Sequence, residues 1–113
     1  MTYITDILSP EELKSCYRSL AKQHHPDKGG NTDVMKQINN EYEIWKEGFT
    51  TYPTRLEELR IGHTVYVNGS PCVVTELCDN LFKAKSLFTK REAYFDRSTG
   101  YGLFNLRLRA YIN

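Results

Sequence analysis

The sequence predicts an α+β protein in which a helical half precedes a small β half. Two observations carry this prediction. Up to about residue 50, apolar residues recur at steps of three and four, which is the spacing of amphipathic helices. From Val65 onward apolar and polar residues alternate, which is the spacing of strands. With 113 residues, the chain has room for one ordinary domain or two very small ones, each with a modest core.

The first helix is predicted to begin at Ser9, which can cap it, because Pro10 then occupies the position that proline favours in a helix. Glu12 can return a hydrogen bond to the cap and complete a capping box. An apolar stripe follows at helical spacing: Leu13, Cys16, Tyr17, Leu20 and Ala21. Three basic residues spaced by four share another face: Lys14, Arg18 and Lys22.

A second helix is predicted after residue 30, with Asn31 or Thr32 as its cap and Gly48 as its end. Its apolar stripe alternates steps of three and four: Met35, Ile38, Tyr42, Trp45 and Phe49. Two such stripes suit antiparallel packing of one helix against the other. The aromatic residues of this stripe are expected in the core and receive no binding role.

The β half is predicted to be a small antiparallel barrel, with an SH3-like barrel as the specific expectation. Asn68-Gly69 is a strong signal for a type I′ hairpin turn. The candidate strands are residues 65–67, 72–77, 81–85, 93–95 and 106–112. The predicted domain organisation is therefore a helical unit at 1–50, a linker or short helical turn at 51–58, and a β-barrel at 59–113.

Composition excludes several classes of protein. The cysteines, Cys16, Cys72 and Cys78, are odd in number and lack Cys-x-x-Cys spacing, so the sequence predicts no disulfide framework, metal site or cofactor. No signal peptide and no apolar run long enough to cross a membrane is visible. We therefore expect a cytoplasmic protein with no membrane partner.

The most informative motif is His25-Pro26-Asp27, which stands between the two predicted helices and is followed by a Lys-Gly-Gly turn. Pro26 cannot continue the first helix and biases His25 toward extended backbone, so the loop should be open to solvent. Asp27 would then present an exposed carboxylate. Flanked by helices in this way, the tripeptide resembles the signature loop of a J-domain over about the first fifty residues of the chain.

The resemblance implies a function. J-domain proteins are co-chaperones that stimulate ATP hydrolysis by DnaK-type chaperones and are not themselves catalytic. Asp27 would pair with an arginine of the chaperone, and His25 and Pro26 would contact the chaperone and shape the loop. The basic face would meet an acidic surface of the chaperone, and it comprises Lys14, Arg18 and Lys22, with Tyr17 between core and surface.

The sequence also departs from the family pattern. Residues 1–8 are too short for a complete first helix, so the apolar residues of this segment should cover the helical hairpin in a reduced form: Tyr3, Ile4, Ile7 and Leu8. No convincing fourth helix follows Trp45, and Ser19 stands where many family members carry another basic residue. The compact layout favours a viral or phage protein, which would act in the host cytoplasm.

Two alternatives remain. An enzyme would use His24, His25 and Asp27 as acid, base or metal ligands, but no catalytic or phosphate-binding motif accompanies them. A small nucleic-acid-binding protein would use a basic groove on the barrel, with the helical hairpin as scaffold. The groove residues would be Lys83, Lys85, Arg107 and Arg109. Against this, residues 59–113 are expected to bind a client or partner protein and to direct the chaperone to it.

Overall fold

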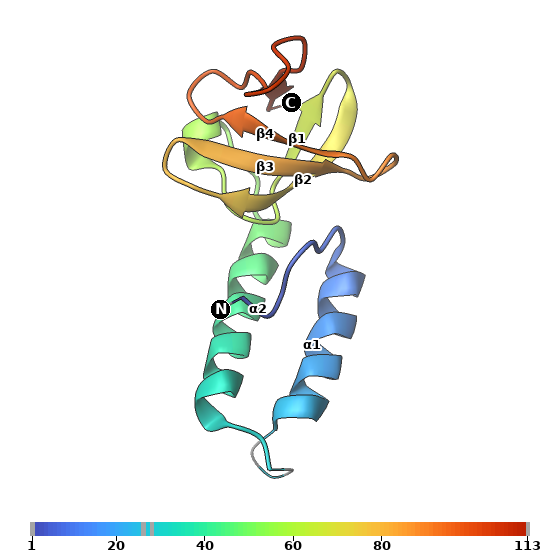
Figure 1. The fold of residues 1–113 in the computed structure, drawn as a ribbon, viewed down its shortest axis with the longest axis vertical. Coiled ribbons are helices and arrows are strands. Elements are labelled where there is room, and N and C mark those ends of the chain that lie inside the picture. The colour runs from blue at the N-terminus through green and yellow to red at the C-terminus, as the bar shows by residue number, and fades with distance from the viewer. Residues whose placement is uncertain (1, 26, 28, 113) are drawn as a thin grey trace.

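The computed structural model describes residues 2–25, 27 and 29–112 of the protein. Its helical half is an antiparallel hairpin of α1 (Pro10–His24) and α2 (Thr32–Thr50), as the apolar stripes predicted (Figure 1). The Ser9 side chain caps α1 by accepting the Glu12 N–H. The Glu12 carboxylate accepts from the Leu8 N–H at 2.9 Å, one residue earlier than a capping box would require. Asn31 caps α2.

Gly48 does not end α2, and that prediction was wrong. The helix continues to Thr50. Gly48 is buried because the loop before the sheet crosses it, and a Cβ atom placed there would lie 1.7 Å from the Ile61 carbonyl oxygen. Gly62, with φ of +97°, lies on the loop at the same contact, facing the backbone of Gly48. The glycine therefore permits a backbone contact between the two halves.

An extended segment, residues 2–8, lies across the hairpin, and we call it the N-terminal strap (Figure 1). Its apolar residues are buried as expected, with Ile4 at 1% exposure. The Glu41 carboxylate of α2 accepts the N–H groups of Tyr3 and Ile4, each at 2.8 Å. The Trp45 indole N–H donates to the Ile4 carbonyl at 3.3 Å. The strap is thus held by backbone hydrogen bonds to two side chains of α2.

The β half is a curled antiparallel sheet of five strands in the order β4-β3-β2-β1-β5. A three-residue 3₁₀ turn at Leu56–Glu58 precedes it. The strands are β1 (Thr64–Val67), β2 (Ser70–Leu77), β3 (Leu81–Ser86), β4 (Glu92–Asp96) and β5 (Ala110–Tyr111). Asn68 and Gly69 both have positive φ, as the predicted hairpin turn requires. The α+β class and the small curled sheet are therefore confirmed.

The last predicted strand, residues 106–112, was mostly wrong, because only Ala110 and Tyr111 form β5. The preceding residues turn instead, and Asn105 accepts the Arg107 N–H with its side chain at 3.0 Å. Isolated bridges from Phe95 to Gly102 and from Tyr101 to Arg109 continue the curl of the sheet beyond β4.

The core has two parts. The sheet encloses one of them, where Phe82 and Phe95 stack from paired positions on β3 and β4 with ring centroids 5.5 Å apart. The second part lies between the helices, the strap and the sheet, because Val73 of β2 packs with Ile38 and Trp45 of α2. The molecule is elongated, about 50 × 27 × 25 Å, with the α1–α2 turn at one end of its long axis and the sheet at the other (Figure 1).

Neither of the two long helices in the described part of the chain has an apolar stretch that could cross a bilayer.

Candidate functional site

The turn between α1 and α2 places His25 and Asp27 at the free end of the helical hairpin. The Asp27 N–H donates to Nδ1 of His25 at 3.2 Å. The same nitrogen lies 3.7 Å from the Asp27 carboxylate, which is too long for a hydrogen bond. Pro26, also predicted to contact the chaperone, lies outside the described residues.

Two glycines close this turn against the end of α1. Gly29 has φ of +81°, a left-handed conformation that glycine adopts without strain. Gly30 donates its N–H to the His25 carbonyl at 3.0 Å. A Cβ on Gly30 would lie 2.0 Å from the carbonyl oxygen of His24, so only glycine fits this close approach. The backbone thus holds His25 and Asp27 in a short, tightly closed loop.

The Asp27 carboxylate projects into solvent, with 89% of the side chain exposed. Among the described residues, His25 alone comes within ion-pair distance of it. An exposed carboxylate on a closed loop can accept two parallel hydrogen bonds from an arginine of another protein. The loop can therefore bind a cationic group.

The predicted basic face of α1 is exposed beside this loop, with Lys14, Arg18 and Lys22 all open to solvent. Tyr17 lies between core and surface, as expected. Its ring centroid is 4.5 Å from that of Tyr42, and its hydroxyl donates to the Asn39 side chain at 2.6 Å. Tyr17 therefore ties the basic face to α2.

The side chains of the two adjacent histidines contact different parts of the molecule. His24, the last residue of α1, packs edge-on against Tyr3 of the strap, with ring centroids 5.9 Å apart. His25 instead faces Asp27. Within residues 2–25, 27 and 29–112, no cluster of three or more histidine, cysteine or acidic side chains is placed to hold a metal.

The basic residues of the β half lie in two separate places. Lys83, on β3, has 15% of its side chain exposed and bridges Glu76 at 3.1 Å and Glu92 at 3.6 Å. Partial burial alone would lower the pKa of Lys83, but these two carboxylates outweigh it and hold the pKa above its usual value. Lys83 is therefore engaged within the protein. Lys85 follows it on the same face of β3.

Arg107 lies in the turn before β5 and Arg109 forms the isolated bridge with Tyr101. In the sheet, β2 and β1 separate β5 from β3. The Arg109 guanidinium lies over the Tyr101 ring, 4.9 Å from its centroid. The four residues proposed for a nucleic-acid groove are thus split between the two places, and Lys83 is already paired.

Sequence reasoning missed two polar residues with a structural task. Glu41 binds the strap. The sequence feature that could have indicated this role is a carboxylate on the apolar face of α2, three residues after Ile38. Arg97 donates from its guanidinium to the carbonyls of Cys78, Glu57 and Leu59 and so fastens the 3₁₀ turn to the sheet. No sequence signal distinguished Arg97 from the other basic residues.

Similarity to known proteins covers from about a third to just over half of this chain. The chaperone protein DnaJ of Ureaplasma parvum is 47% identical over 38 residues, which are 32% of this chain and 10% of that protein. DnaJ protein homolog 2 of Allium porrum is 47% identical over 36 residues, 32% of this chain and 9% of that protein. The chaperone protein DnaJ of Paramagnetospirillum magneticum is 36% identical over 67 residues, 56% of this chain and 16% of that protein.

The chain thus spans at most 16% of the length of these relatives. No protein-family model and no solved structure matches it. The shared segment, together with an antiparallel hairpin that exposes His25 and Asp27 at its turn, confirms the resemblance seen in the sequence. About a third of this chain is therefore a segment similar to DnaJ-type proteins, as expected of a J-domain.

Proposed function

We propose that this protein is a J-domain co-chaperone that binds a DnaK-type chaperone through the α1–α2 turn and stimulates its ATP hydrolysis. In this proposal the protein is not an enzyme. It works in the cytoplasm, where such a chaperone is found, and the β half directs the chaperone to a client or partner protein. The similarity to DnaJ proteins supports the first part, and the separation of the two ends of the molecule supports the second.

The observation that carries the proposal is the exposed Asp27 carboxylate on a glycine-closed loop. A charge-assisted pair between a carboxylate and an arginine is short and directional, and the solvent-exposed Asp27 carboxylate is open to such a partner. Asp27 is the residue whose loss should matter most. His25 would support it by accepting the Asp27 N–H and fixing the loop.

The basic face of α1 would assist by attracting an acidic surface of the chaperone. Lys14, Arg18 and Lys22 are exposed, so each would act mainly by steering the encounter and would lose effect as salt is added. Tyr17 fixes the orientation of this face relative to the loop through its contacts with α2.

A nucleic-acid-binding function is the less favoured alternative. It required Lys83 to face a phosphate backbone, whereas Lys83 pairs with Glu76 and Glu92. Each phosphate contact needs a free cation. The remaining basic residues of the β half are better suited to a smaller anionic partner.

The test is steady-state ATP hydrolysis by a DnaK-type chaperone with and without this protein. We expect the wild-type protein to accelerate turnover and Asp27→Asn to return it to the basal rate, because the substitution removes the charge and leaves the core untouched. Asp79→Asn is the matched control, since Asp79 is also exposed but lies on the turn between β2 and β3.

Circular dichroism should give the same helix content and melting temperature for both variants. Stimulation by Asp27→Asn equal to that by Asp79→Asn would contradict the proposal, as would an absence of stimulation by the wild-type protein.

A further inference from the structure

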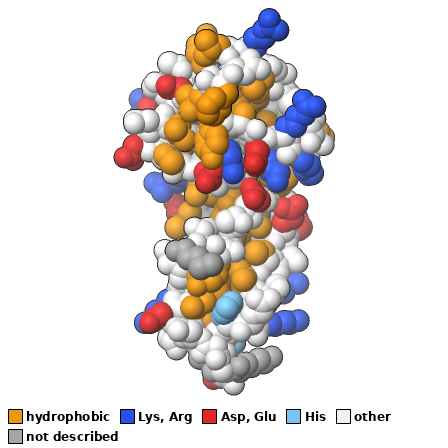
Figure 2. Space-filling view, in the orientation of Figure 1, with side chains coloured by type: hydrophobic (Ala, Val, Ile, Leu, Met, Phe, Trp, Pro, Cys, Tyr) orange, Lys and Arg blue, Asp and Glu red, His pale blue; other side chains and the backbone are white. Residues whose placement is uncertain are grey.

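The segment between Gly102 and Leu108 exposes large apolar side chains at the sheet end of the molecule, and we call residues 103–107 the tip loop. Leu103 is 43% exposed, Phe104 90% and Leu106 76%. Hydrophobic side chains gather over this end in the space-filling view, with basic side chains at the edge (Figure 2). Contiguous apolar surface of this kind marks an interaction site on a protein that must stay dissolved.

The tip loop has a fixed shape. Gly102 donates its N–H to the Leu108 carbonyl at 2.9 Å, and Leu108 donates back to the Asn105 carbonyl at 3.1 Å. The Asn105 side chain accepts the Arg107 N–H at 3.0 Å. A Cβ on Gly102 would lie 2.5 Å from the Asn105 carbonyl oxygen, so the loop folds back closely on itself. A preordered loop loses little entropy when it binds.

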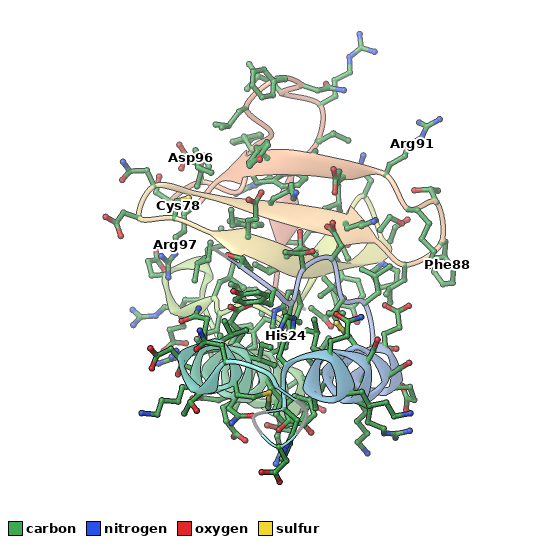
Figure 3. The ribbon with its side chains drawn as sticks, turned by 60° about the horizontal axis from the view of Figure 1, so that its bottom comes forward. His24, Cys78, Phe88, Arg91, Asp96 and Arg97 are labelled. Carbon is green, nitrogen blue, oxygen red and sulfur yellow. The ribbon has the colours of Figure 1, made fainter. Side chains whose placement is uncertain are left out.

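A pocket of about 400 Å³ opens between the tip loop and the end of the sheet. The buried side chains of Cys72, Ala84 and Phe95 line its interior. The exposed residues Asn105 and Arg91 line its rim. Figure 3 shows Arg91 pointing outward at the same end of the sheet as Phe88, whereas Cys78, Asp96 and Arg97 lie at the opposite end. A pocket of this size, with an apolar floor and a polar rim, can hold one large apolar side chain.

The tip loop and the chain that follows it carry only basic charges. From Arg97 to the end of the chain the sequence has no Asp or Glu. Arg107, in the tip loop, and Arg109, two residues later, are both exposed, and the Arg109 guanidinium lies over the ring of Tyr101. The one acidic residue that lines the pocket, Glu92, is paired with Lys83. A guanidinium fork held on an aromatic ring favours carboxylates, which it can bind through two hydrogen bonds.

We propose that the tip loop and this pocket bind an acidic segment of a partner protein, which inserts one large apolar side chain into the pocket. The inference names the chemistry of the partner that the proposed function requires, and it rests on that function for its biological role. A bilayer has no protruding side chain to fill this pocket. A nucleic acid could stack a base on Phe104 but would leave the exposed Leu side chains of the tip loop without an apolar partner.

The experiment is a selection of random dodecapeptides displayed on phage against the full-length protein. Enriched peptides are expected to carry at least two acidic residues next to Phe, Leu or Trp. One such peptide is then labelled and its affinity measured by fluorescence anisotropy. We expect Phe104→Ser and Leu106→Ser each to weaken binding by about tenfold or more, because exposed apolar anchors carry most of such interfaces. Arg109→Gln should weaken it by about threefold and reduce its salt dependence.

The matched control is Tyr52→Ser, because Tyr52 is 89% exposed but lies in the segment after α2. It should leave peptide affinity unchanged, as should Asp27→Asn. The assay contains no chaperone, so failure of ATPase stimulation would leave this result intact. The proposal is overturned if no acidic peptides are enriched, or if Phe104→Ser binds as well as the control. Tighter binding to phosphatidylglycerol vesicles or to an oligothymidylate than to the peptide would also overturn it.

Discussion

Gly48→Ala is the sharpest test of how the two halves of the molecule are joined. In an exposed helix this substitution stabilises, because alanine has a helix propensity about 0.8–1.0 kcal/mol better than glycine. At this position the new Cβ would lie 1.7 Å from the carbonyl oxygen of Ile61 and 2.7 Å from its carbonyl carbon. Both atoms belong to the backbone, so no side-chain rotation relieves the contact.

The size of the effect follows from this geometry. Cβ atoms in proteins keep at least 3.0 Å from other heavy atoms, so the loop carrying Ile61 must move by at least 3.0 − 1.7 = 1.3 Å. Displacement of that size at a packed contact costs about 1–3 kcal/mol or more. It would also loosen the packing of Val73 against α2. We expect a free energy of unfolding about 1–2 kcal/mol below that of the parent, after the gain in propensity.

The measurement is urea denaturation followed by Trp45 fluorescence and circular dichroism. Asn40→Ala is the control, because Asn40 is exposed on the same helix and its replacement should stabilise by about 0.5 kcal/mol. A Gly48→Ala variant as stable as the parent, or stabilised like the control, would refute the close contact between α2 and the loop before the sheet.

Two further outcomes follow from buried polar groups. Glu41→Ala removes the acceptor of two strap N–H groups and should lower the free energy of unfolding by about 3 kcal/mol in urea denaturation, whereas exposed Glu43→Ala should change it by less than about 0.5 kcal/mol. Burial lowers the pKa of His63 below its value of about 6.5 in the unfolded chain; the charge of Arg60 lowers it further, and that of Glu47 opposes the shift. Stability should therefore fall as the pH drops through about 6.5, because the unfolded chain then binds a proton that the folded protein does not. His63→Asn, which keeps an acceptor but does not titrate, should remove this dependence between pH 7.5 and 5.5; an unchanged pH profile would contradict the assignment.

The elements that local chemistry determines could be predicted from the sequence. The start of α1 follows from Ser9 and Pro10, and the β1–β2 turn follows from Asn68-Gly69, because each depends on residues that are adjacent in the chain. The end of α2 could not be predicted in this way. Gly48 is a helix terminator in its local context, but in the fold it accommodates a segment thirteen residues later.

The same distinction applies to the candidate site. His25 and Asp27 could be placed on an exposed loop because the flanking helices and glycines are local signals. The role of Glu41 depends on a strap that lies 37 and 38 residues away in sequence. Lys83 looked like a free cation because the sequence does not show that Glu76 and Glu92 face it from neighbouring strands. The strand predicted at 106–112 rested on the alternation of its residues, yet Asn105 starts a turn that takes up the first of them.

The backbone contact between Gly48 and Gly62 has a mechanical consequence. The segment after α2 does not behave as a flexible tether. The glycine crossing holds residues 61 and 62 against α2, and Arg97 fastens residues 57 and 59 to the sheet. With a flexible tether, the distance and orientation between two bound proteins would vary by diffusion, and the length of the tether would set only their effective concentration. Here the helical hairpin and the sheet form a spacer about 50 Å long. A protein held at the tip loop would therefore stand at a set distance and orientation from whatever the α1–α2 turn binds.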